Sequence, residues 1–133
     1  MTAGGPREDR PRPVRAGRKL GDFAERLAAT YVERHGYRIL ARNVHLRYGE
    51  IDIVAEQDGQ TVLVEVRARR DGDLGSPLSS LTAAKQRRMR LCAELFLALH
   101  PELPQEARID VVAVTLDGRG RVRSIDLVRN AVC

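Results

Sequence analysis

Three carboxylates interrupt two short stretches that otherwise have the apolar, β-branched character of β-strands: Glu50 and Asp52 in GEIDIVAEQ, and Glu65 in TVLVEVRARR. Side chains alternate across a strand, so Glu50 and Asp52 are expected on one face, with Ile51 and Ile53 on the other. Buried carboxylates are costly unless a partner neutralises them. If the two strands pair closely, Asp52 and Glu65 meet, and a divalent cation between them would relieve their repulsion.

The same spacing also fits an ordinary hairpin whose charged residues face water. Alternating apolar and charged positions are typical of an antiparallel strand with one solvated face. Periodicity therefore leaves two interpretations open: a carboxylate pair that binds a cation, or a solvated strand face.

The elements that must position these carboxylates follow from hydrophobic periodicity and turn signals. Apolar residues recur with helical spacing from Leu20 onward, and Gly36 can end that helix. Asp58-Gly59 indicates a tight hairpin turn between the two acidic strands. The sequence predicts a mixed α/β fold, with a central sheet of about five strands flanked by helices. In chain order the expected elements are a helix over residues 20–35, strands over 37–46, 51–56 and 61–68, a helix over 82–99 that Thr82 caps, and strands over 109–116 and 122–127.

The length of 133 residues suits one domain, and a hydrophobic content of 43% is ordinary for a globular protein. Residues 1–17 are rich in Pro, Gly and Arg and lack periodicity, so we predict a disordered basic tail before a domain over residues 18–133. No apolar run approaches the ~18 residues that a membrane span needs. The absence of a signal-peptide pattern and the presence of only two cysteines lead us to expect a cytoplasmic protein.

The net charge of +5 and a pI of about 9.9 are a mild indication of a nucleic-acid partner. Six basic and two acidic residues fall within the first nineteen, so most of the excess lies in the tail. A solvated tail explains this charge as well as a nucleic-acid partner does.

Five stretches in matching order resemble the YraN family, bacterial proteins related to archaeal Holliday junction resolvases and to the restriction-endonuclease-like fold. The match covers roughly residues 18–115. The stretches are LGDFAERLAATYVERHGYRILARN, GEID, VEVRAR, residues 75–85, and RIDVVAV at residues 108–114.

The resemblance implies a restriction-endonuclease-like fold and an Mg²⁺-dependent endonuclease, with Mn²⁺ as an alternative metal, that acts on branched or otherwise structured DNA. Asp52 and Glu65 fall on the family's metal-binding positions, and Glu25 matches its helix glutamate. The family's usual glycine before that glutamate is Ala24 here. Related resolvases act as symmetric dimers, so a homodimer is an expectation from the resemblance alone.

The sequence departs from the family at Arg67, because the third block ordinarily reads Glu-x-Lys. A lysine amine can lose its proton when it is buried beside a metal, whereas a guanidinium essentially cannot. Arg67 can still neutralise charge and bind a phosphate. A metal-dependent nuclease and a DNA-binding module with weak or no cleavage both stay open, and a role outside nucleic acid is the remaining alternative.

The apolar stripe of the predicted second helix does not extend to its first turns. On the same helical face, those turns have the basic residues Lys85 and Arg88. Either their stems pack while the charges reach water, or the first turns overhang the site and Lys85 points at the scissile phosphate. Lys85 lies in the fourth family block, which favours the second interpretation, and it would then supply the cation altered at position 67. We expect phosphate contacts from arginines bordering the site and one aromatic near the substrate: Arg69, Arg70, Arg87, Arg88, Arg90 and Tyr48.

Overall fold

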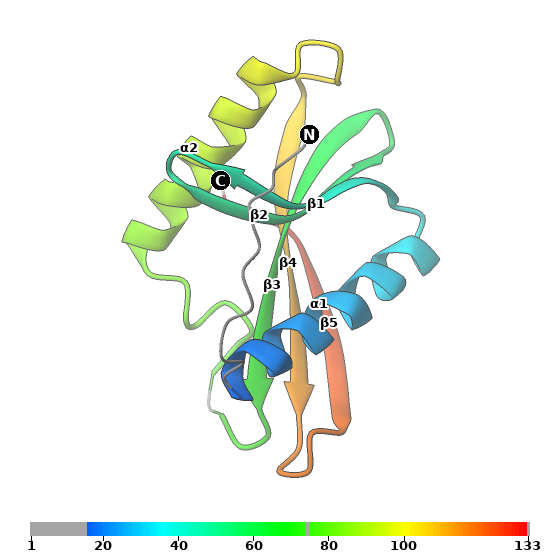
Figure 1. The fold of residues 1–133 in the computed structure, drawn as a ribbon, viewed down its shortest axis with the longest axis vertical. Helices are drawn as coiled ribbons and strands as arrows, with labels where there is room; N and C mark the ends of the chain where they lie inside the picture. The colour runs from blue at the N-terminus through cyan, green and yellow to red at the C-terminus, as the bar shows by residue number, and fades with distance from the viewer. Residues whose placement is uncertain (1–15, 74, 133) are drawn as a thin grey trace, which may run out of the picture.

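Two helices and five strands follow one another in the order that the sequence predicts (Figure 1). The structure, a computed structural model, describes residues 16–73 and 75–132. The basic tail predicted over residues 1–17 lies outside the described residues, apart from its last two, which begin the first helix. The elements are α1 (Ala16–Arg34), β1 (Arg38–Leu46), β2 (Gly49–Gln57), β3 (Gln60–Arg70), α2 (Ala83–Leu99), β4 (Ala107–Leu116) and β5 (Val122–Val132).

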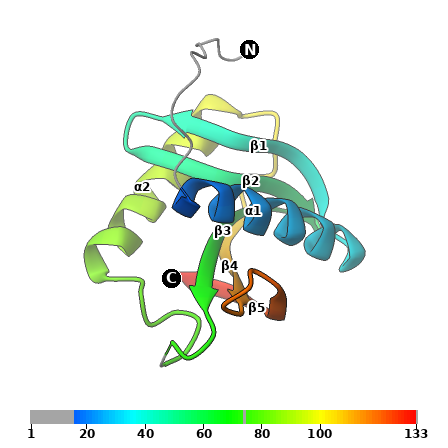
Figure 2. The same ribbon diagram turned by 60° about the horizontal axis from the view of Figure 1, so that its bottom comes forward.

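The strands form one mixed sheet in the order β1-β2-β3-β4-β5. β3 and β4 are parallel, because α2 connects them as a crossover, and the other neighbouring pairs are antiparallel. Figures 1 and 2 show the β1–β2 hairpin running across the direction of β3, β4 and β5. The mixed sheet of five strands with flanking helices confirms the predicted fold class.

The helices cover opposite faces of the sheet, each over its own core cluster. Ala24, Ala28 and Val32 of α1 pack on the alternate β3 residues Val62 and Val64. On the other face of the sheet, Cys92, Ala93 and Phe96 of α2 pack on Leu63, the β3 residue between Val62 and Val64. Burial on both faces explains why β3 and β4 are almost continuously apolar. Neither helix of the described chain is long and apolar enough to cross a membrane.

The predicted turn and cap residues have the conformations their roles require. Asp58 and Gly59 have φ of 53° and 77°, as a tight hairpin turn demands. Gly36 has φ 89° just beyond α1. The Thr82 hydroxyl accepts the Lys85 N–H at 3.1 Å and caps α2.

Two expectations are wrong in detail. β5 extends to Val132 and not to residue 127, because a bulge at Asn130, where φ is 52°, lets Val132 pair with Ile109. Ile51 and Ile53 do not share a face: Ile53 packs in the α1 cluster and Ile51 in the α2 cluster. The strand changes face between them because β2 twists away from β3 at this point.

Candidate active site

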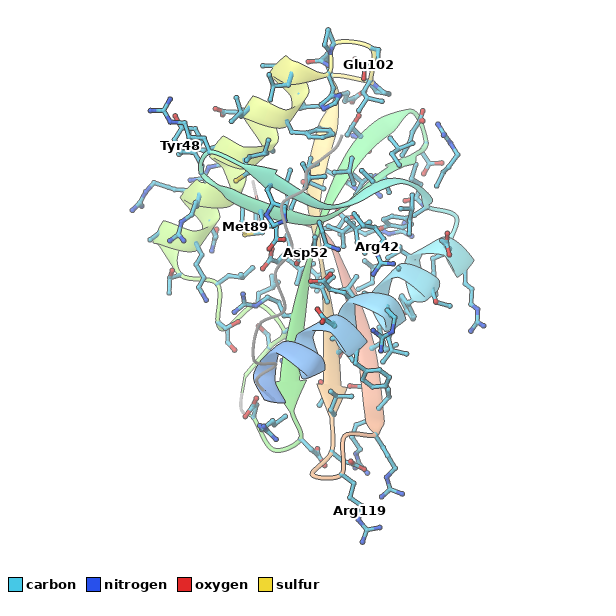
Figure 3. The ribbon with its side chains drawn as sticks, viewed as in Figure 1. Arg42, Tyr48, Asp52, Met89, Glu102 and Arg119 are labelled. Atoms are coloured by element: carbon cyan, nitrogen blue, oxygen red, sulfur yellow. The ribbon has the colours of Figure 1, made fainter. Side chains whose placement is uncertain are left out.

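The candidate site lies where β2 and β3 separate. The strands pair from their shared turn as far as Ile53 and Val64, and the gap beyond this pair is called the fork. Continuing the register by one residue places Asp52 opposite Glu65. Asp52 Oδ2 accepts a hydrogen bond from the Val66 N–H at 2.8 Å, so a side chain takes the place of the next backbone partner between the two strands. Figure 3 shows Asp52 where β2 crosses β3.

The two carboxylates are half-buried and act on each other. Burial, followed by the negative charge of Glu65, raises the pKa of Asp52 to about 7, although the Val66 N–H opposes this shift. Burial also raises the pKa of Glu65, against the lowering effect of Arg67. Two ionised carboxylates in this place would repel, so the fork favours either a proton or a cation.

Two further carboxylates extend this acidic group to α1 and to the start of β2. Burial, then the charges of Glu50 and Asp22, raise the pKa of Glu25, and Glu65 adds to the effect. Glu50 is more exposed and lies 3.4 Å from His45 Nε2. Glu25, Glu50, Asp52 and Glu65 therefore form one electrostatic group drawn from α1, β2 and β3.

Asp110 shows how the same protein neutralises a carboxylate that has a structural role. Asp110 is fully buried in β4 and accepts hydrogen bonds from Tyr37 Oη at 2.7 Å and from the Asn130 N–H at 2.8 Å. Arg108 Nε donates to both of its oxygens at 3.1 Å. Among the described residues, the Asp52 carboxylate accepts one hydrogen bond, from the Val66 N–H, so its charge is far less compensated than that of Asp110.

The donor set of the fork fits a hard cation with few protein ligands. Within the described residues, no group of three or more His, Cys, Asp or Glu side chains is arranged to hold a metal ion. Mg²⁺ commonly keeps several waters and is bound by one or two carboxylates together with substrate phosphate. Asp52 and Glu65 supply two such carboxylates, and their mutual repulsion would be relieved by the cation.

Cations from α2 border the same place. A hollow of about 180 Å³, called the α2 hollow, lies between the fork and the first turns of α2, and Lys85 and Arg88 line it beside Glu65. The charge of Lys85 lowers the pKa of Glu65. The first turns of α2 therefore overhang the carboxylates. The residues that line the α2 hollow are Gly49, Glu50, Glu65, Arg67, Leu81, Lys85, Arg88, Met89 and Cys92.

Arg67 is held by two neighbours at the edge of this hollow. Its Nη1 lies 3.3 Å from Glu65 Oε2, and its Nη2 donates to Ser80 Oγ at 2.9 Å. The guanidinium thus links a carboxylate of the fork to the loop before α2. Sequence reasoning missed Ser80, which offers no signal beyond its place in a Ser-rich loop.

The expected phosphate contacts differ in their distance from the fork. Arg69 is half-buried, and its Nε has no hydrogen-bond partner among the described residues. Arg70 and Arg87 are exposed and, unlike Arg88, do not line the α2 hollow. Tyr48 is 42% exposed at the β1–β2 turn, where the guanidinium carbon of Arg47 lies 5.7 Å from the centre of its ring, and Figure 3 shows it well away from Asp52.

Arg90 is placed elsewhere. It lines a separate hollow with Arg108, Ile109 and Asn130, between α2 and strands β4 and β5. The expectation that Arg90 borders the site is wrong, because the helical turn carries its side chain away from the face that holds Lys85 and Arg88.

Fold and site together define a class: an α/β protein with a mixed sheet, a helix on each face and a pair of half-buried carboxylates at the fork between two strands. The chain belongs to the uncharacterised protein family UPF0102, whose model matches residues 24–114, and this confirms the resemblance to the YraN family.

Relatives in the same family match almost their whole length. A UPF0102 protein of Symbiobacterium thermophilum is 45% identical over 114 residues, which is 86% of this chain and 96% of that protein. One of Roseiflexus castenholzii is 46% identical over 116 residues, covering 86% of this chain and 93% of the relative. Among solved structures, a repair endonuclease from Pyrococcus abyssi aligns with a TM-score of 0.42 at 16% identity, over 84% of this chain and 43% of that one.

Proposed function

We propose that the protein is a metal-dependent endonuclease that hydrolyses phosphodiester bonds in branched or otherwise structured DNA, with Mg²⁺ or Mn²⁺ as its cofactor. The observation that carries the proposal is the pair of half-buried, mutually repelling carboxylates Asp52 and Glu65 beside the cations Lys85 and Arg88. When bound, the metal would polarise a phosphate oxygen and lower the pKa of a bound water.

The remaining side chains have roles that follow from their places. The Val66 N–H fixes the Asp52 carboxylate through Oδ2. Lys85 and Arg88 can bind the scissile phosphate from the α2 side. The Glu25 carboxylate, whose pKa is raised, can accept a proton from water at the edge of the fork.

The contacts of Arg67 support a second candidate, a DNA-binding module with weak or no cleavage. Glu65 and Ser80 already engage its guanidinium, and a guanidinium cannot serve as a general base. In that case the charges around the fork bind phosphate without hydrolysing it. Lys85 distinguishes the two candidate functions, because it lines the α2 hollow and its amine, unlike a guanidinium, can take part in proton transfer.

Cleavage of labelled four-way junctions and linear duplexes, with Mg²⁺ or Mn²⁺, tests the proposal. The wild-type protein is expected to cleave the junction, and Asp52→Asn, which keeps the side-chain shape, is expected to be inactive. Glu102→Gln is the matched control, because Glu102 is an exposed acid at the far end of the molecule (Figure 3). Equal cleavage by the wild-type protein and Asp52→Asn would place any activity at another site or in a contaminant.

A homodimer is part of this proposal, because a four-way junction offers two symmetric strands to cut. We place the activity in the cytoplasm and in DNA recombination or repair, the setting in which branched DNA arises. Sedimentation equilibrium with and without junction DNA tests the oligomeric state. A monomer under both conditions would remove the dimer and leave the nuclease proposal standing.

A further inference from the structure

The fork continues onto β1 through a residue that directly opposes Asp52. Arg42 pairs with Ile53, and Val44 pairs with Ile51, so the residue between them, Asn43, faces Asp52 across the ladder. Asn43 has φ 54°, a left-handed conformation that Asn tolerates better than most residues. Three adjacent strands thus present Asn43, Asp52 and Glu65 in one row, with Asn43 on the open edge of the sheet.

A second hollow opens beside this row, on the α1 side. It measures about 340 Å³, and it is called the α1 hollow; Asp22, Glu25, Arg26, Arg42 and Asn43 line it. Glu25 connects it to the fork, because Arg42 lowers the pKa of this acid while Glu50 and Glu65 raise it. Figure 3 shows Arg42 and Asp52 close to the crossing of the hairpin with β3.

The two arginines of the α1 hollow are available to an anion. Arg26 and Arg42 are both exposed, and neither forms an ion pair within 4.0 Å in the described part of the chain. Arg26 lies over the Phe23 ring, with its guanidinium carbon 5.9 Å from the ring centre. Arg67, by contrast, is already engaged by Glu65 and Ser80. Free guanidinium groups suit bidentate contacts with phosphate.

The acids of the α1 hollow define which phosphate it can hold. Asp22 and Glu25 oppose the arginines, so a free phosphate ion would bind weakly there. A phosphate in a DNA strand that Lys85 and Arg88 already bind is different, because the strand tethers it near the α1 hollow. The effective concentration of that phosphate at the hollow is therefore high.

We propose that Arg42 and Arg26 bind a phosphate of the DNA strand beside the scissile phosphate, on the α1 side of the fork, whereas Lys85 and Arg88 contact the scissile phosphate from the α2 side. The strand then crosses the fork from α2 to α1, with the scissile phosphate over Asp52 and Glu65. This inference rests on the proposed function, and it assigns a binding site outside the carboxylate pair.

Salt dependence of DNA binding measures the contact. Affinity for a labelled four-way junction is measured by fluorescence anisotropy from low to moderate salt with Ca²⁺, which supports binding without cleavage in many Mg²⁺ sites. The double variant Arg26→Gln/Arg42→Gln, which loses the whole contact with this phosphate, is expected to reduce the slope of log affinity against log salt by about 0.9. Arg42→Gln, which keeps Arg26, is expected to reduce the slope by part of that amount. Arg42→Lys is expected to keep the slope.

Arg119→Gln is the charge-matched control, because Arg119 is exposed at the β4–β5 turn, far from Arg42 (Figure 3). It is expected to leave the slope at the wild-type value. Equal slopes for Arg42→Gln and Arg119→Gln, with wild-type binding intact, would overturn the inference and leave the proposed function standing. A wild-type protein that binds neither junction nor duplex would overturn both.

Neutral methylphosphonate linkages, placed one at a time along the junction strand, locate the phosphate. One linkage near the cleavage position is expected to weaken binding by the wild-type protein. The same linkage is expected to have less effect on Arg42→Gln and none on Arg26→Gln/Arg42→Gln, which lacks both positive charges of the α1 hollow. A penalty that stays the same in the wild-type protein and the double variant at every linkage would contradict the α1 hollow as the binding site.

Discussion

Arg67 is the residue at which this chain departs from the chemistry its family pattern implies. Its guanidinium is fixed by Glu65 at 3.3 Å and by Ser80 at 2.9 Å, where an amine would be free to exchange a proton. We expect Arg67→Lys to leave DNA affinity nearly unchanged and to raise single-turnover cleavage, by up to the ~10²–10⁴-fold typical of a positioned proton-transfer group. An unchanged rate would mean that another amine, with Lys85 first, already does this work.

Asp52 makes the stability of the metal-free protein depend on pH. Its pKa in the folded protein, about 7, lies above the ordinary value of 3.8, so the folded state binds the proton more tightly than the unfolded state. The resulting stabilisation is fully present below about pH 4 and is lost as the pH rises through about 7. Glu65, whose pKa is also raised, acts in the same direction.

Urea unfolding in EDTA at pH 5 and pH 8 measures this effect. The wild-type protein is expected to be less stable at pH 8, by an amount of the order of a few kcal/mol. Asp52→Asn is expected to lose most of this difference, and adding Mg²⁺ at pH 8 is expected to stabilise only the wild-type protein. An identical pH dependence in the two proteins would show that Asp52 does not have the raised pKa described above.

At the scale of helices and strands, the sequence predicts those features that depend on residues close together in the chain. The order of helices and strands, the turn at Asp58-Gly59 and the Thr82 cap all follow from periodicity and residue preference. The extension of β5 does not, because it depends on a bulge at Asn130 and on pairing with Ile109. The change of face at Asp52 also depends on long-range pairing, since β2 leaves β3 there.

The β2–β3 hairpin sets the register that brings Asp52 to Glu65, and its turn is testable by itself. Gly59 has φ 77°, and no atom lies within 4 Å of the place that an added Cβ would take, so Gly59→Ala adds backbone strain without a clash. We expect a loss of about 1 kcal/mol in the free energy of unfolding. Gly118→Ala is the control, because Gly118 has equal space and no positive φ. Equal effects of the two substitutions would contradict the conformational explanation.

At the scale of the whole molecule, the net charge of +5 says little about where DNA would lie, because six basic and two acidic side chains fall in residues 1–19. The positions of the charges say more about where DNA would lie: basic residues of α2 on one side, and of α1 and β1 on the other, flank the acidic fork. The sequence and the family resemblance point to Asp52, Glu65, Glu25 and Lys85 as site residues. Arg42 and Asn43 cannot be found in that way, since their place beside Asp52 depends on the β1–β2 register.

The most direct measurement is single-turnover cleavage of a labelled four-way junction at saturating protein, followed as Mn²⁺ is titrated from zero. We predict no cleavage in EDTA and a rate for the wild-type protein that rises to a plateau with Mn²⁺. Asp52→Asn and Glu65→Gln are predicted to bind the junction and to leave it uncut at every Mn²⁺ concentration. Cleavage in EDTA, or a wild-type plateau rate in either variant, would contradict a metal-dependent nuclease centred on this carboxylate pair.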